Sequence, residues 1–459
     1  MADFLCDAED ALGRAKAPSP AELDDILSRA GELKGLSLSD AAKLLMIENE
    51  DALGAVYEKA AEVKSAVFGP RVVLFAPLYL SNYCSNDCLY CGFRKSNTTA
   101  RRKALSPDEA VEQAKILSRT GFKRIILVAG EHPLYSGVDY LIKIAEEIYS
   151  RTDMRILHVN SAPVSVEDFK RLKSAGYGVY QCFQETYHKE SYKVLHPTGK
   201  KSDFLYRLSV MDRALEAGFG DVGIGPLLGL YDYHYDALAA IAHSKHLEAK
   251  FGACAHTISV PRLKSAEGAE IKDAPYPVSD EDFRKIVAVY RLSVPQAGVV
   301  VSTREPAKLR EECLLCGASQ ISAGSSTEPG GYGRSTGGIP RDRSTSQFHL
   351  GDIRPLPEMA RVIAEMGFLP SLCTACYRSG RQGNNYLHVA SSGNLNELCT
   401  ANALLSLKEY LIDVSPQPEG REIIEAALNR FLEEFKGKLK EDVKKKMKMV
   451  EKGERDVHY

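Results

Sequence analysis

The segment VVLFAPLYLSNYCSNDCLYC, residues 72–91, joins an apolar run to three closely spaced cysteines. Residues 72–79 have the length and apolar content of a buried strand. The cysteines follow with the spacing Cys84-x3-Cys88-x2-Cys91. A 4Fe–4S cluster takes four ligands, and this loop supplies three thiolates, so one iron would stay open to another ligand. The segment therefore predicts an iron–sulfur site directly after a strand, with a zinc knuckle or unpaired core cysteines as the alternatives.

On the C-terminal side of this segment, apolar runs alternate with amphipathic helical patterns along the middle of the chain. Helices are expected at 107–119, 139–149, 204–216, 280–294 and 307–315, and Ser106 and Ser279 have the character of N-caps. Eight strand–helix units in series predict an α/β fold, a (β/α)8 barrel of the TIM type, with an open doubly wound sheet as the alternative. The expected strands are 72–79, 124–129, 155–159, 178–183, 222–228, 256–260, 299–302 and 320–323.

The pattern divides the chain into three parts. We expect a helical N-terminal segment at 1–70, the barrel at 71–350 and a helical C-terminal domain at 351–459, with helices at 356–366, 397–411 and 421–435. The Gly, Ser, Thr and Arg-rich stretch 325–350 favours a functional loop or lid over a linker. The Lys-rich residues 444–448 predict a solvated helix face and a fraying end, or else a docking surface for an acidic partner.

Composition excludes several functional classes. A net charge of −2 gives no reason to expect nucleic acid. No apolar run approaches the roughly 18 residues of a membrane span, and the acidic start of the chain lacks a signal peptide. Eleven cysteines without an export signal favour a reducing cytoplasm, where thiols bind metals rather than form disulfides.

A second cysteine set lies in the C-terminal part. Cys373-x2-Cys376 is followed, after 22 intervening residues, by Cys399. On spacing alone, this set fits zinc with His388 as the fourth ligand, or a second iron–sulfur cluster with an open iron.

Together these features resemble a known family. The cysteine loop after a strand resembles the radical S-adenosylmethionine (SAM) superfamily. Over residues 70–412 the chain resembles the tyrosine lyases of FeFe-hydrogenase maturation, the HydG family, which are related to the 2-iminoacetate synthase of thiamine biosynthesis. The second cysteine set separates the two families. The resemblance rests on both sets and on the phrases LVAGEHP (127–133), FQETYH (183–188), HTISVPR (256–262) and STREP (302–306).

The resemblance implies roles for residues at the first site. Cys84, Cys88 and Cys91 would hold the SAM-binding 4Fe–4S cluster, and Gly130 and Glu131 would contact SAM. Arg304 is the candidate that grips the carboxylate of L-tyrosine, with a structural salt bridge on the barrel rim as the alternative. Ser319 and Ser322 are weaker candidates for hydrogen bonds to the same carboxylate.

The resemblance also implies a reaction in two stages. Tyrosine would be cleaved to p-cresol and dehydroglycine, and dehydroglycine would pass through a closed lumen to a second 4Fe–4S cluster on Cys373, Cys376 and Cys399. There it would give carbon monoxide and cyanide, which leave as an iron–carbonyl–cyanide–cysteine precursor of the hydrogenase H-cluster. His256 would bind an additional labile iron carrying free L-cysteine, and its second ring nitrogen would need an orienting partner.

Partners and alternatives follow from the same resemblance. Other hydrogenase maturation proteins and an electron donor are expected partners. One alternative is an enzyme that stops at tyrosine cleavage and supplies dehydroglycine for thiazole synthesis. The other is a non-catalytic iron–sulfur carrier or scaffold.

The remaining cysteines are expected to serve packing. Cys313 and Cys316 have knuckle spacing but lie in the apolar stripe of an expected helix, and Cys6 and Cys182 are read as incidental. Cys254, two residues before His256, would either perturb the labile-iron site or pack.

Overall fold

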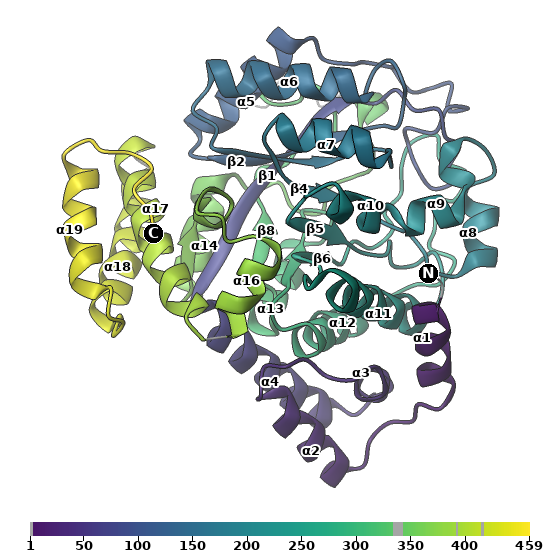
Figure 1. Cartoon of the computed structure of the whole chain (residues 1–459), viewed down its shortest axis with the longest axis horizontal. Helices are drawn as coiled ribbons and strands as arrows, with labels where there is room; N and C mark the ends of the chain where they lie inside the picture. Colours follow the sequence, from purple (N-terminus) through teal and green to yellow (C-terminus); the bar gives the residue numbers. More distant parts are fainter. Residues whose placement is uncertain (1–2, 334–342, 392, 415–416) are drawn as a thin grey trace.

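Eight parallel strands close into a barrel in the computed structural model, which describes residues 3–333, 343–391, 393–414 and 417–459 (Figure 1). Neighbours in sequence pair in order, and β1 pairs with both β2 and β8, which closes the ring. The predicted (β/α)8 barrel is confirmed, and the open sheet is excluded. The strands are β1 Arg71–Ser81, β2 Arg124–Ala129, β3 Ile156–Asn160, β4 Tyr177–Gln181, β5 Asp221–Ile224, β6 Thr257–Ser259, β7 Gly298–Val301 and β8 Gln320–Ser322.

The helices around the barrel begin where their caps predict. Ser106 and Glu109 form a capping box, in which each side chain accepts a hydrogen bond from the other residue's backbone N–H. The expected helix 204–216 is broken at Ser209 into two short helices. The barrel helices are α5 Pro107–Arg119, α6 Val138–Arg151, α7 Val166–Ser174, α8 Lys189–Leu195, α9 Phe204–Leu208, α10 Val210–Glu216, α11 Tyr233–Phe251, α12 Asp280–Ser293 and α13 Ala307–Leu315.

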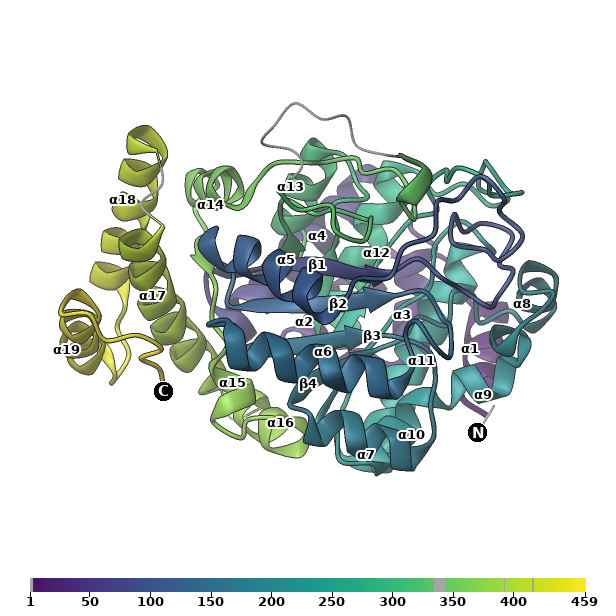
Figure 2. The ribbon, with the colours of Figure 1, turned by 90° about the horizontal axis from the view of Figure 1, so that it is seen from above.

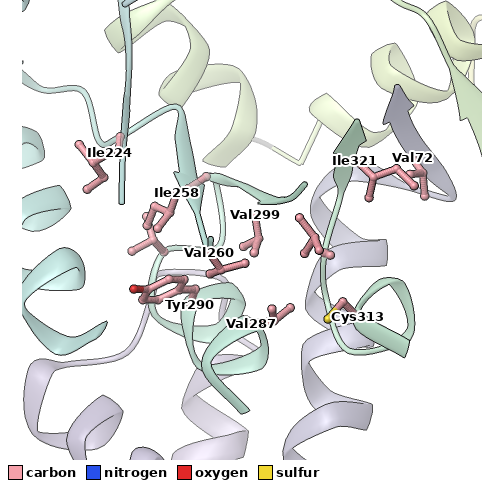
Figure 3. Packing of buried hydrophobic residues seen from close by; sticks show 14 of the residues in the cluster. Val72, Ile224, Ile258, Val260, Val287, Tyr290, Val299, Cys313 and Ile321 are labelled. Atoms are coloured by element: carbon pink, nitrogen blue, oxygen red, sulfur yellow. The ribbon is translucent and has the colours of Figure 1, made fainter. Parts of the chain in front are cut away.

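Apolar side chains that point outward from the barrel strands form the core between the strands and the surrounding helices (Figure 3). Ile258 and Val299 belong to the same buried cluster as Val287 and Tyr290 of α12. Burying one such side chain contributes about 1.5–3 kcal/mol. Cys313, fully buried on α13, and the buried Cys316 belong to this core, as the sequence predicts.

Four helices precede the barrel and lie below it in Figure 1. They are α1 Asp3–Gly13, α2 Pro20–Ala30, α3 Leu38–Leu45 and α4 Glu50–Phe68. Helix α1 packs on α11, whereas α3 and α4 pack on α12. The N-terminal segment thus covers the helices of one side of the barrel.

The C-terminal part contains one strand that the helical prediction omits. Residues 369–371 pair in parallel with the start of β1, with Arg71 opposite Leu369. A three-residue strand carries no periodic signal, so only its long-range pairing identifies it. The elements here are α14 Leu356–Glu365, β9 Leu369–Ser371, α15 Ala375–Arg378, α16 Gly383–Ser391, α17 Leu395–Asp413, α18 Pro418–Glu434 and α19 Lys440–Glu451.

The Lys-rich segment is more ordered than the sequence suggests. It belongs to α19, which packs on α17 and buries Val443, Met447 and Val450. The fraying-end prediction is therefore wrong, whereas the solvated face is correct, because the lysines at 444, 445 and 448 lie on the exposed side.

Two further predictions concern loops and membranes. Residues 334–342 of the expected lid lie outside the described residues, while the described Gln347 and Phe348 line the barrel mouth. Within the described ranges, no helix combines the length and apolar content that a bilayer span requires.

Asp236 of α11 is a fully buried carboxyl group in the helical layer. Its Oδ1 accepts hydrogen bonds from Thr186 Oγ1 at 3.0 Å and from the Tyr187 backbone N–H at 2.8 Å. Its Oδ2 has no hydrogen-bond partner among the described residues. Burial raises the pKa of Asp236 from 3.8 to about 7. The folded protein therefore retains a proton here that the unfolded chain releases.

We expect Asp236→Asn to stabilise the protein increasingly as pH rises. Between the unfolded pKa of 3.8 and the folded pKa of about 7, the native state binds the extra proton, so wild-type stability falls with rising pH. The slope is at most about 1.4 kcal/mol per pH unit, and asparagine removes it while keeping the acceptor oxygen. Anaerobic thermal denaturation at pH 5 and pH 8 measures this, with the exposed Asp24→Asn as control. A gain that is equal at both pH values would contradict the assignment.

Candidate functional site

The first cysteine loop leaves β1 at its carboxyl end and is held by the loop that follows β2. The backbone N–H and the hydroxyl of Ser85 both donate to the Glu131 carbonyl oxygen at 2.8 Å. A Cβ on Gly130 would lie 2.4 Å from the Tyr83 carbonyl oxygen, so only glycine permits this approach. The Gly130-Glu131 phrase therefore lies directly against the cysteine loop.

These residues converge on a cavity of about 200 Å³ at the mouth of the barrel. Sequence candidates from β1, β2, β7 and β8 meet there although they are far apart in the chain. The predicted residues that line the cavity are Cys84, Cys88, Cys91, Gly130, Glu131, Arg304 and Ser322.

The three thiols are chemically suited to a metal cluster. Burial raises the pKa of Cys84 to about 11, of Cys88 to about 12 and of Cys91 to about 11. A buried thiolate is unfavourable unless a cation compensates it, and iron supplies that charge. The Phe93 backbone N–H donates to Cys91 Sγ at 3.4 Å, a contact of the kind that tunes cluster ligands. The donor set therefore fits a 4Fe–4S cluster.

Two ion pairs in this cavity have partners that the sequence does not reveal. Glu131 accepts from Arg207 Nη1 at 2.8 Å and from Asn86 Nδ2 at 2.7 Å. Lys201 Nζ donates to Glu185 Oε1 at 2.5 Å. Glu185 also has a left-handed backbone, with φ of 70°, which a non-glycine residue adopts at some energetic cost. Paired charges of both signs suit a zwitterionic ligand such as the methionine part of SAM.

Arg304 has the surroundings of an anion-binding residue. Its guanidinium carbon lies 3.3 Å from the centroid of the Phe348 ring. Burial lowers its pKa, and among the described residues no carboxylate forms an ion pair with it. The neighbouring Glu305 instead binds Arg262 and Lys264. The guanidinium is therefore available to a ligand in the cavity.

The two serine candidates, Ser319 and Ser322, lie at different ends of the barrel. Ser322 lines the cavity, and its Oγ accepts a hydrogen bond from the Thr303 backbone N–H at 3.0 Å. Ser319 does not line the cavity, because it precedes β8 at the amino end of the barrel. Its hydroxyl there accepts from Arg291 Nη2 at 3.1 Å. The structure thus brings Ser322, and not Ser319, to the other candidates.

The second cysteine set closes the opposite end of the barrel. Cys373, Cys376 and Cys399 line a cavity of about 50 Å³ together with Val73 and Gln320, which lie near the starts of β1 and β8. In Figure 2, α15 and α17, which carry Cys376 and Cys399, lie at the end of the barrel away from the loops that follow β1. The two cysteine sets therefore lie at opposite ends of the barrel.

This set too has the surroundings of an iron–sulfur site. Burial raises the pKa of Cys376 to about 12, and the Ala375 backbone N–H donates to Cys373 Sγ at 3.3 Å. Arg71 and Arg381 line the same cavity, where their positive charges lie near the Cys399 and Cys376 thiols. Such cationic donors favour anionic sulfur ligands.

The sequence alternative of a zinc ion with His388 has no geometric support. His388 is exposed on α16 and does not line the cavity of the three cysteines. Within the described ranges, no three His, Cys, Asp or Glu side chains are arranged around a single metal ion.

His256 lines the second cavity and is 8% exposed. Its Nε2 lies 3.0 Å from the Tyr377 hydroxyl oxygen, and its Nδ1 lies 3.3 Å from Asp221 Oδ1. This Nδ1 makes no hydrogen bond to the described residues, so Asp221 lies beside the ring as a nearby carboxylate. Cys254 is buried but does not line the cavity, which favours a packing role.

Comparison with known proteins agrees with this geometry. Residues 78–243 match the Radical SAM superfamily, and residues 259–369 match the Biotin and Thiamin Synthesis associated domain. The 2-iminoacetate synthase of Salmonella typhimurium is 32% identical over 346 residues, which are 75% of this chain and 89% of that protein. The corresponding enzyme of Escherichia coli is 31% identical, with the same coverage.

Solved structures extend the similarity to the whole chain. A crystal structure of HydG, described as a maturase of the [FeFe]-hydrogenase, superposes with a TM-score of 0.94 at 43% identity over 100% of both chains. HydG from Carboxydothermus hydrogenoformans gives 0.85 at 37% identity over 98% of both chains. Radical SAM enzymes use SAM and a 4Fe–4S cluster. The chain belongs to the HydG family of radical SAM lyases, which is related to 2-iminoacetate synthase.

Proposed function

We propose that this enzyme cleaves L-tyrosine to p-cresol and dehydroglycine at the barrel mouth and converts dehydroglycine to carbon monoxide and cyanide at the opposite end. The product would be an Fe(CO)(CN)–cysteine precursor of the FeFe-hydrogenase H-cluster. The observation that carries this proposal is the pair of cysteine triads, each lining a cavity at one end of the barrel.

At the mouth, Cys84, Cys88 and Cys91 would hold the SAM-binding 4Fe–4S cluster, which with SAM supplies the radical that removes hydrogen from the tyrosine amine. Gly130 and Glu131 hold the SAM amino acid. The planar guanidinium of Arg304 grips the tyrosine carboxylate with two parallel N–H donors, which fixes the position of the amine. Ser322 is the remaining candidate for a hydrogen bond to that carboxylate, since Ser319 contacts Arg291 instead.

At the other end, Cys373, Cys376 and Cys399, in the domain proposed at 351–459, would hold a second 4Fe–4S cluster that supports formation of the two diatomic products. His256, with the Asp221 carboxylate beside its ring, would hold the additional iron that carries free L-cysteine. A closed path through the barrel interior would exclude bulk water and protect dehydroglycine from hydrolysis. An electron donor and other hydrogenase maturation proteins would be the partners.

The relatives named 2-iminoacetate synthase favour a second candidate, in which the reaction stops after tyrosine cleavage. The second cysteine triad counts against it, because tyrosine cleavage alone does not require a second set of cluster ligands. Anaerobic incubation of the reduced, cluster-loaded enzyme with SAM and tyrosine separates the candidates. Cresol with carbon monoxide supports the maturase function. Cresol with glyoxylate and no carbon monoxide supports the synthase, and absence of cresol supports a scaffold.

Substituting one cysteine in each set should separate the two reactions. We expect Cys88→Ala to abolish SAM cleavage and every later product, because the first cluster loses a ligand. Cys376→Ala should retain cresol formation within about twofold while carbon monoxide falls below detection. Chromatography of cresol and carbon monoxide binding to haemoglobin measure both. Equal loss of cresol in the two variants would refute separate sites.

Arg304→Lys should lower kcat/KM for tyrosine while the affinity for SAM stays unchanged. Lysine keeps the charge but loses the two-pronged donor, and a hydrogen bond to a charged group contributes about 1.5–3 kcal/mol. We therefore expect kcat/KM for tyrosine to fall about 10- to 100-fold, mainly through KM. The affinity for SAM, measured by equilibrium dialysis without tyrosine, serves as the internal control. An unchanged KM for tyrosine would show that Arg304 has a structural role and does not bind the substrate.

His256→Ala should leave cresol formation intact and lower carbon monoxide output at least tenfold, because the additional iron loses its imidazole ligand. Asp221→Asn should act in the same direction but less strongly, since it leaves the ligand and removes its orienting charge. Iron per protein, counted before and after turnover, complements the gas measurement. Wild-type carbon monoxide output from His256→Ala would remove the residue from the metal site.

A further inference from the structure

Four side chains form an exposed, largely apolar patch on the outside of the first cysteine loop. Leu134 is 77% exposed and Tyr135 40% exposed, and both belong to the loop between β2 and α6. The Tyr135 ring stacks on the Tyr83 ring with centroids 4.0 Å apart, and the His132 ring lies 4.9 Å from Tyr135. We call Tyr83, His132, Leu134 and Tyr135 the mouth patch. Single exposed apolar residues are common on proteins, whereas a contiguous group of them marks an interaction surface.

The mouth patch lies next to a cluster ligand but outside the cavity at the barrel mouth. Tyr83 directly precedes Cys84, so their Cα atoms are about 3.8 Å apart. Cys84 lines the cavity, whereas the four patch residues do not. Substrate binding in the cavity therefore does not account for the patch. A protein seated on it would be one residue away from a ligand of the first cluster.

The loop that carries the patch is held rigidly by hydrogen bonds. His132 Nδ1 accepts from the backbone N–H groups of Leu134 at 3.2 Å and Tyr135 at 3.4 Å. The buried Ser136 hydroxyl donates to the Gly130 carbonyl oxygen. A surface that is already ordered loses little conformational entropy when a partner binds.

Two exposed lysines lie beside the same cysteine loop. The Lys95 backbone N–H donates to the Asn86 carbonyl oxygen at 2.9 Å. The Lys201 backbone N–H donates to Asn86 Oδ1 at 3.0 Å, which places the preceding residue, Lys200, next to the loop as well. Helix α8 lies at this end of the barrel too (Figure 2), because the Leu89 backbone N–H donates to the carbonyl oxygen of its last residue.

The exposed charges around the cysteine loop are mainly positive. Among the described residues, no carboxylate forms an ion pair with Lys95, with Lys200 or with the exposed Lys193 of α8. The exposed acids on α8 and on the segment 199–208 are Glu190 and Asp203, and Asp203 caps α9. The chain as a whole has a net charge of −2, so this face differs in sign from the average. An uncompensated positive face favours an acidic partner.

We propose that the mouth patch, together with Lys95 and Lys200, is the docking surface for a small acidic iron–sulfur protein that delivers single electrons to the first cluster. This inference rests on the proposed function, in which an electron donor is a partner. One electron leaves the reduced cluster of the partner, which is thereby oxidised, and reduces the cluster of the enzyme. No bond forms or breaks in this step, and no proton moves.

The two parts of the surface have different tasks. The lysines attract the acidic partner and orient it before contact, an effect that salt screens. The stacked tyrosine rings and Leu134 supply apolar contact area, and aromatic residues of this kind contribute most to the affinity of protein interfaces. The contact places the redox centre of the partner close to Cys84, and electron transfer is fast only over a short distance.

The first test measures binding without turnover. Anaerobic, cluster-loaded enzyme is titrated calorimetrically with an oxidised two-cluster bacterial ferredoxin of acidic surface. We expect Leu134→Ser and Tyr135→Ser each to weaken binding fivefold or more. The double variant Lys95→Glu with Lys200→Glu should weaken binding strongly at low ionic strength and much less at about 0.15 M salt, where surface charges are screened.

Matched controls lie far from the first cysteine loop. Leu315→Ser changes another exposed leucine, at the end of α13. Lys445→Glu reverses an exposed lysine of α19 in the C-terminal part, and so changes the net charge without touching the mouth. Both should bind the ferredoxin as the wild type does.

The second test compares two reductants. With reduced ferredoxin as the electron source, the Leu134→Ser and Tyr135→Ser variants should cleave SAM at least fivefold more slowly than the wild type. With dithionite they should match it, because a small anion needs no docking surface. Equal slowing with both reductants would overturn the proposal, since the patch would then support the cysteine loop itself.

Three binding results would also overturn it. They are wild-type affinity in both patch variants, a loss in Lys445→Glu as large as in the double variant at the mouth, and absence of binding by the wild type. Binding and SAM cleavage are measured without reference to carbon monoxide. Wild-type enzyme that binds the ferredoxin at the mouth patch but forms no carbon monoxide would therefore refute the proposed function and leave the docking surface established.

Discussion

The hydrogen bonding of β1 is the constraint on which the rest of the structure depends. This eleven-residue strand pairs with β8 and β9 along its first half and with β2 along its second half. It closes the barrel and also ties both cysteine sets to one rigid element. The first set leaves its carboxyl end, and β9, which leads into Cys373, is aligned on its amino end. At about 3.3 Å per residue, β1 alone separates the two ends by roughly 30 Å.

The two ends provide different electrostatic environments for similar ligands. At the mouth, buried cations are matched by buried carboxylates, as in Arg207 with Glu131 and Lys201 with Glu185. At the other end, three thiols and three arginines line one cavity, and Asp221 lies beside His256 with its Oδ1 3.3 Å from Nδ1. A balanced site suits a zwitterion, whereas an arginine-rich site suits anionic sulfur and anionic small molecules. The distribution of charge therefore agrees with a division of labour between the two ends.

The proposed transfer of dehydroglycine between the two ends would explain why both cysteine sets belong to one chain. An imine released into water is hydrolysed, so transfer inside the protein would raise the fraction that reaches the second set.

The sequence by itself determined the barrel, both cysteine sets and most of the mouth, because strand runs, caps and ligand spacings are local patterns. All eight strands and the helices at 107–119 and 307–315 follow from periodicity. Only the tertiary structure decided which side chains meet. Tyr377 contacts His256 across 121 positions in the chain, and Lys201 reaches Glu185 from a three-residue 3₁₀ helix that has no distinctive sequence pattern. Ser319 and Ser322, three residues apart, contact opposite ends of the barrel because one precedes β8 and the other completes it. Such pairings arise from the closure of the sheet, which no local pattern encodes.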